Sequence, residues 1–145
     1  MLVTLDTNVL FMALYSSKGA SHQILELIRH SEAQLALSVP VLKEYEDVLL
    51  RPSSLQTLDV EVSEVVDFLD ALVLLAFPFD IHYLMRPNLR DENDNMFVDL
   101  AFASSSEFLV TSNLRDFSLS AELKFDSFKL VTPAAFISNW RNRNG

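Results

Sequence analysis

With 145 residues, half of them hydrophobic, the chain has enough apolar material for one core and too little for two. It contains no cysteine, which excludes disulfides, thiolate metal sites and cysteine nucleophiles and suits a cytoplasmic protein. Its formal net charge of −9 argues against a passive nucleic-acid binder, because such proteins gain affinity from basic surfaces that neutralise phosphates.

Strands and helices alternate along the first half of the chain. A β-branched apolar run from Leu2 to Leu5 predicts a strand, and the apolar stretch 9–14, soon after Asp6, predicts a helix. Ser21 is expected to cap a second helix. The next elements are a strand at 35–38, a helix from Pro40 that Pro52 stops, and a longer helix whose buried face holds Val62, Val65, Val66, Leu69 and Val73.

The second half continues the alternation around one polar segment. Residues 74–81 suit an edge strand, because they contain Pro78, and residues 86–95 read as a polar loop. The remaining elements are a helix at about 95–105 that buries Phe97, Val98, Ala101 and Phe102, strands at 108–111 and 129–131, and a terminal helix from Pro133 whose last residues fray. We therefore expect a single α/β domain over residues 1–145, with a mostly parallel sheet covered on both faces. No apolar run reaches the roughly 20 residues of a membrane helix.

Acidic side chains fall where such a sheet binds ligands, beyond the carboxyl ends of its strands. Asp6 ends the first strand, Glu44 lies one turn into the helix after the second, and Asn113 and Asp116 follow a later strand. Asp94 stands at the start of a helix, where the dipole favours an anion. Taken alone, Asp6 or Asp94 could be a helix cap, and Glu44 a solvated side chain.

Carboxylates that lie within a few ångströms of one another repel, so they take up protons or share a cation. Oxygen ligands select Mg²⁺, Mn²⁺ or Ca²⁺ rather than zinc, and Mg²⁺ leaves coordination positions for water and substrate phosphate. This donor set is typical of a phosphodiesterase. A bound cation would also offset the repulsion between an acidic chain and a polyanionic substrate.

Five ordered segments carry a family resemblance: LDTNVLFMAL at 5–14, SVPVLKEYEDVLLRP at 38–52, RDENDNMFVDLAFA at 90–103, FLVTSNLRDF at 108–117 and LVTPAAFI at 130–137. They span nearly the whole chain and resemble a PIN domain, in particular the VapC-type toxin ribonucleases. The resemblance implies a three-layer α/β/α fold and cleavage of single-stranded RNA that depends on Mg²⁺ or Mn²⁺. It also implies a cognate antitoxin that blocks the pocket, and the apolar composition is compatible with a homodimer.

The resemblance also assigns the site residues. The first three family acids fall on Asp6, Glu44 and Asp94, and Thr7 and Asn8 match the polar pair that supports the first acid.

The fourth family acid follows a threonine and one small residue. In this chain Thr111 and Ser112 precede Asn113, so an amide stands where the family has aspartate. Asparagine can coordinate through its carbonyl oxygen but brings no charge. Asp116 could take its place, or the site could hold one metal ion rather than two.

Two other functions stay open. Asn113 is compatible with a weakened or inactive PIN-like module that binds RNA or a protein partner without cutting. A phosphatase with Asp6 as nucleophile would need a second acid two residues later, where Asn8 stands.

Several further charged and aromatic residues allow either a functional or an ordinary structural interpretation. The arginines at 86, 90 and 115 could steer phosphate or be ordinary loop charges, and the histidines at 22 and 82 read as surface groups. The acids at 91, 92 and 99 read as surface charges or as support for the ligands. Aromatic residues at helical spacing read as core, namely Phe11, Tyr45 and Phe102.

Overall fold

The computed structural model describes residues 1–81, 92–117 and 128–144, without the side chains of 92–94 and 116. Within these ranges a five-stranded sheet has the order β3-β2-β1-β4-β5. The strands are β1 (Leu2–Leu5), β2 (Gln34–Leu37), β3 (Phe77–Pro78), β4 (Phe108–Val110) and β5 (Lys129–Val131). Each neighbouring pair is parallel, which confirms the expected α/β class.

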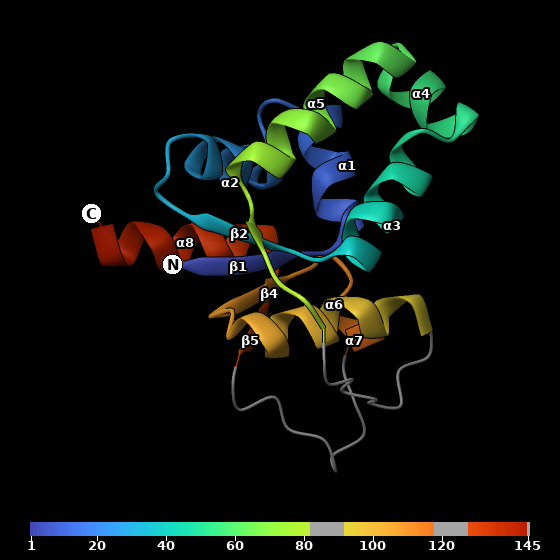
Figure 1. Cartoon of the computed structure of the whole chain (residues 1–145). Coiled ribbons are helices and arrows are strands. Elements are labelled where there is room, and N and C mark those ends of the chain that lie inside the picture. Colours follow the sequence, from blue (N-terminus) through green and yellow to red (C-terminus); the bar gives the residue numbers. More distant parts are fainter. Residues whose placement is uncertain (82–91, 118–127, 145) are drawn as a thin grey trace.

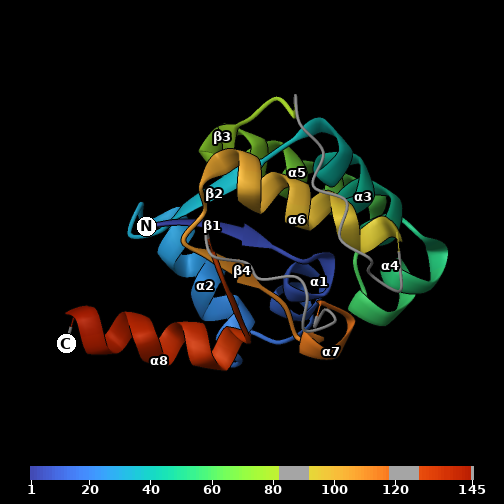
Figure 2. The same ribbon diagram turned by 90° about the horizontal axis from the view of Figure 1, so that it is seen from below.

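Helices cover both faces of the sheet. They are α1 (Thr7–Tyr15), α2 (Ala20–Arg29), α3 (Val39–Leu49), α4 (Pro52–Leu58), α5 (Val62–Leu75), α6 (Glu92–Ser104), α7 (Leu114–Phe117) and α8 (Pro133–Asn144). In Figure 1, α6 and α7 lie below the strands and α2 and α5 above them. α8 packs against α2, and Figure 2 shows it well away from α6. The fold therefore has the three α/β/α layers that the resemblance implies.

The central strands are apolar because both of their faces are covered. Leu5, Leu109 and Val110 are fully buried. Aromatic rings join α6 to two neighbouring helices. The centroid of the Phe97 ring on α6 lies 6.3 Å from that of Tyr45 on α3 and 6.5 Å from that of Phe117 on α7. α6 is thereby fixed between α3 and α7.

The buried face of α5 differs from the predicted one. Val65, Leu69 and Leu72 are at most 4% exposed, whereas Val66 and Val73 are 39% and 44% exposed. Val62, the first residue of α5, is also exposed. The buried residues 65, 69 and 72 are four and three residues apart, which is the spacing of one face of an α-helix. Val66 and Val73 each follow one of these residues directly and therefore lie on the solvent side.

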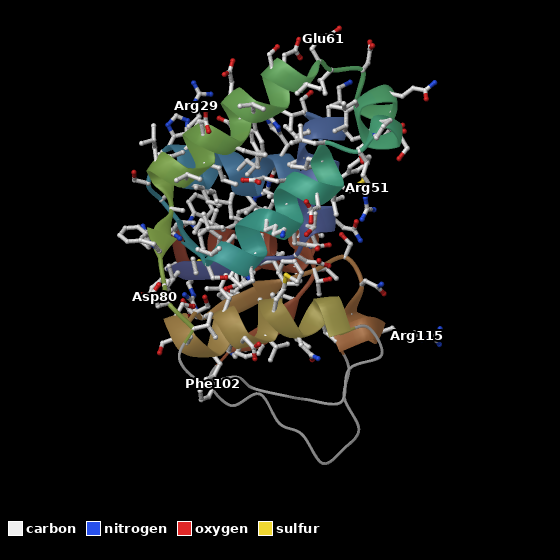
Figure 3. The ribbon with its side chains drawn as sticks, turned by 45° about the vertical axis from the view of Figure 1, so that its right-hand side comes forward. Arg29, Arg51, Glu61, Asp80, Phe102 and Arg115 are labelled. Carbon is white, nitrogen blue, oxygen red and sulfur yellow. The ribbon has the colours of Figure 1, made fainter. Side chains whose placement is uncertain are left out.

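Three local predictions are wrong. Ser21 does not cap α2, because Gly19 holds the N-cap position and Ser21 is the second helical residue. Pro52 does not stop the helix that precedes it, because α3 already ends at Leu49 and Pro52 begins α4. Phe102 is 37% exposed and points away from the sheet, as Figure 3 shows.

The remaining differences concern the ends of elements. α6 begins at Glu92, three residues before the expected start, and the predicted polar loop otherwise falls at residues that the structure leaves undescribed. α8 continues to Asn144, where we expect fraying from the sequence. β3 is an edge strand, as predicted, but it is shorter than the predicted range 74–81, because α5 continues to Leu75. In the described ranges, no helix has the length and apolar character needed to cross a bilayer.

Candidate active site

The candidate site lies at the carboxyl ends of β1 and β4. The strand order reverses between these two strands, and a parallel α/β sheet binds ligands at such a point. Asp6 directly follows β1, and its backbone N–H donates to the carbonyl of Val110 at 2.9 Å. In Figures 1 and 2, α1, α3 and α7 begin at this end of the sheet, and the first turn of α6 also lies there.

Asp6 is buried, and its carboxylate is turned toward the neighbouring strand. It stands at the N-cap position of α1, but its side chain does not accept the cap hydrogen bond. Instead Asp6 Oδ2 accepts a hydrogen bond of 2.8 Å from the hydroxyl of Thr111. The same hydroxyl oxygen accepts the backbone N–H of Asn113 at 3.0 Å. The carboxylate is therefore held by the segment after β4, and it is not an ordinary helix cap.

Glu44 comes to this edge on α3, which Ser38 caps by accepting the N–H of Val41 at 3.4 Å. The Glu44 side chain is partly exposed, so solvent can reach it. The next residue, Tyr45, is fully buried and donates its hydroxyl to the carbonyl of Leu5 at 2.5 Å. Burial, and to a lesser extent the charge of Asp6, raises the pKa of Tyr45 well above its ordinary value. The phenol therefore stays protonated and remains a donor.

The assignment of Tyr45 to the core is confirmed, but its hydrogen bond was not predicted. A signal exists in the sequence: a tyrosine on a buried stripe needs a partner for its hydroxyl, and this one follows Glu44 directly.

Two polar residues of α6 are buried: Asn95, which the sequence analysis missed, and Asp99, which it left as a surface charge or as support for the ligands. Asn95 and Asp99 are 6% and 4% exposed, so Asp99 is not a surface charge. Their spacing of four residues places them on one face of the helix, which is the signal that could have found them.

Asp94 is the third residue of α6, and Asp116 lies in α7. Their backbone positions agree with a site at this edge of the sheet, while their side chains lie outside the described set. The described side chains contain no group of three metal-binding residues. The clustering of the three acids therefore remains a prediction.

Buried polar atoms beside the proposed ligands fit a hydrated cation. Within the described residues, Thr7 Oγ1 and Asn95 Oδ1 are buried and have no hydrogen-bond partner. Such atoms commonly pair with water or an ion, and each belongs to a residue that directly follows a proposed ligand in sequence. The hard oxygen donors of Asp6 and Glu44 suit Mg²⁺ or Mn²⁺.

The exposed polar residues among the other proposed supporting residues form what we call the rim of the candidate site. Asn8, Ser112 and Asn113 are exposed, in contrast to buried Thr7 and Thr111.

Of the arginines that could steer phosphate, Arg115 lies within the described residues. Arg115 on α7 is exposed, and Figure 3 shows Arg115 and Arg51 on the same side of the molecule. His22 Nδ1 lies 3.3 Å from the carbonyl of Ala13, so it joins α2 to α1 rather than to the site. The other basic candidates, Arg86, Arg90 and His82, lie outside the described residues, as does Asp91.

The model of the PIN domain family matches residues 2–115. The fold is similar to a chain in the crystal structure of VapBC2 from Rickettsia felis bound to a DNA fragment from their promoter. That similarity has a TM-score of 0.56 at 19% identity and covers 91% of this chain and 98% of the other. A search of curated protein sequences finds no significant match. PIN domains are generally nucleases that use divalent metals. Because the family model covers most of the sequence, the chain belongs to the PIN domain family.

Proposed function

We propose that the chain is a ribonuclease that depends on Mg²⁺ or Mn²⁺ and hydrolyses phosphodiester bonds in single-stranded RNA in the cytoplasm. The observation that carries this proposal is the buried Asp6 carboxylate, held by Thr111 at the point where the strand order reverses. Family membership adds that the fold generally serves as a nuclease.

Each residue has a proposed role. Asp6, Glu44 and Asp94 would hold the metal ion, and Asp116 would be a further ligand. Thr111 fixes the direction of the Asp6 carboxylate through its 2.8 Å hydrogen bond. A bound Mg²⁺ or Mn²⁺ would activate the attacking water and offset the charge of the scissile phosphate.

The residues at the rim complete the site. Asn113 would orient a water or contribute its carbonyl oxygen. Thr7, Asn8 and Ser112 would support the ligands.

We also propose that the enzyme is the toxin of a toxin–antitoxin pair. The structure with a similar fold is a VapBC complex, which supports an antitoxin as partner. The antitoxin would block the site most simply by placing a basic side chain among the carboxylates. A neighbouring reading frame that encodes a small protein with a basic C-terminal segment would support this role.

The Asp6→Asn substitution tests the activity. Cleavage of a single-stranded RNA oligonucleotide should require Mn²⁺ or Mg²⁺, stop with EDTA, and fall at least about a hundredfold in the variant, because the ligand loses its charge. Asp67→Asn, the same change at an exposed position on α5, should cleave like the wild-type protein. Equal cleavage by wild-type protein and Asp6→Asn would refute the assignment.

The alternative is a binding module that does not cut, and the amide of Asn113 favours it. Calorimetry with Mn²⁺ separates the two. Binding that Asp6→Asn abolishes supports a working site, whereas a wild-type protein that binds RNA but no Mn²⁺ would favour the module.

A further inference from the structure

We propose that Tyr45 is a positioning residue that sets the place of Glu44 and α6 relative to Asp6. This inference rests on the proposed function, since it concerns the same three acids. Its basis is a single side chain that joins the three elements carrying them.

The first link is the hydrogen bond between α3 and β1. Tyr45 donates to the carbonyl of Leu5 at 2.5 Å across 40 residues of sequence. Leu5 directly precedes Asp6, and Tyr45 directly follows Glu44. One hydrogen bond therefore connects the immediate neighbours of two proposed ligands.

The second link is the contact between the Tyr45 ring and α6. The ring centroid lies 6.3 Å from that of Phe97, which follows Asp94 by three residues on the same helix. Both rings are at most 2% exposed, so neither can move without disturbing the core. A shift of Tyr45 would change the spacing of all three elements at once.

The hydroxyl is what distinguishes this position from its neighbours. Among the residues that the structure describes, four other aromatic side chains are at most 2% exposed, and all four are phenylalanines: Phe97, Phe108, Phe117 and Phe136. Phenylalanine would fill the same volume if packing were all that the position required. Burying a hydroxyl is unfavourable unless it is hydrogen-bonded, and here its partner is the residue before Asp6.

Tyr45→Phe tests the proposal, because it removes the hydroxyl and keeps the ring. Mn²⁺ affinity measured by calorimetry should weaken about tenfold, as it does when groups that orient metal ligands are removed. In cleavage assays kcat should fall while KM for the RNA oligonucleotide stays within about twofold, because Tyr45 does not touch substrate.

Two matched variants control for other effects. Tyr15→Phe makes the same chemical change at a 58% exposed position and should bind Mn²⁺ like the wild-type protein. Val65→Ala on α5 opens the core away from the site, so it reports what a comparable loss of Tm does to Mn²⁺ affinity. An equal loss of affinity in Val65→Ala and Tyr45→Phe would overturn the proposal, as would unchanged affinity in Tyr45→Phe.

Three further outcomes are decisive. If Tyr45→Phe does not fold, Phe97→Leu weakens the ring contact instead, and unchanged Mn²⁺ affinity in that variant would also overturn the proposal. If Asp6→Asn cleaves RNA as well as the wild-type protein does, the proposed function fails, whatever Tyr45→Phe does. If that pair behaves as expected and Tyr45→Phe matches the wild-type protein, only this inference fails.

Discussion

A few buried polar side chains define the candidate site at the scale of single residues. Asp6 is 6% exposed and Thr111 is fully buried, yet they meet through a hydrogen bond across 105 residues of sequence. Buried polar groups are tolerated when they are paired, and a charged acceptor makes such a bond stronger. The geometry around Asp6 is therefore fixed before any metal ion binds.

Asn113 offers a gain-of-function test at this scale. Its backbone N–H already bonds to Thr111, and its side chain is exposed at the rim, so Asn113→Asp should fold normally. The added charge would restore the family's fourth acid. We expect severalfold faster Mn²⁺-dependent cleavage and binding of a further Mn²⁺ by calorimetry. Ser112→Asp adds the same charge one position earlier, and an equal gain there would show that charge alone, rather than position, is responsible.

At the scale of elements, the sequence predicts long periodic segments well and short ones poorly. α3 and α6 were predicted because their apolar residues repeat over several turns. β1 is short, but its apolar run stops sharply at Asp6. α4 and α7 have seven and four residues, too few to show a period.

The residues of the candidate site could be predicted from the sequence only in part. Asp6 was predicted because it ends a strand and the ends of parallel strands share one edge, and Thr111 was predicted because the resemblance places a threonine before the fourth acid. The hydrogen bond of Tyr45 and the burial of Asn95 were missed, and Asp99 was left between two readings, because an apolar pattern does not show which polar side chain of a helix faces inward. Only the packing of α3 and α6 against the sheet reveals that.

The end of α8 is tied to the sheet by an ion pair that should depend on pH. Arg143 donates to Glu107, and its guanidinium carbon lies 5.6 Å from the centre of the Phe108 ring. The hydrogen bond from Arg143 lowers the pKa of Glu107. A lowered pKa means that the stabilisation is present above the ordinary pKa of glutamate and is lost as pH falls through the folded-state value.

Arg143→Gln should therefore lower Tm near neutral pH and matter less and less as the pH drops below the ordinary range of glutamate. The effect should not exceed a few degrees, because exposed ion pairs contribute little. Arg141→Gln is the matched control, since Arg141 donates to neutral Gln23 at 3.0 Å. Thermal unfolding between pH 3 and pH 7 checks this, and a difference for Arg143→Gln that persists at pH 3 would contradict it.

At the scale of the whole molecule, the net charge of −9 limits how RNA can be held. Proteins that bind through many phosphate contacts lose about 10³ to 10⁵ in affinity between 50 and 200 mM salt. This chain has 11 lysines and arginines against 20 acids, so few phosphates can be neutralised by side chains.

RNA affinity should therefore depend on divalent metal more than on monovalent salt. Raising KCl from 50 to 200 mM at fixed Mn²⁺ should weaken binding of a non-cleavable oligonucleotide to the wild-type protein less than tenfold. Omitting Mn²⁺ should weaken binding of the same oligonucleotide to the wild-type protein more strongly. Fluorescence anisotropy checks both, and a steep dependence on KCl would reveal a basic surface that the charge does not predict.

The central place of β1 in the sheet has a consequence for the timing of synthesis. Asp6 leaves the ribosome before its partners do: Thr111, which follows β4, is 105 residues later in the sequence. At about 5 to 20 residues per second, that delay is roughly 5 to 20 s. During this time the nascent chain has Asp6 but not the strand that orients it. An enzyme that cuts RNA would thus mature only after the segment around Thr111 has been made.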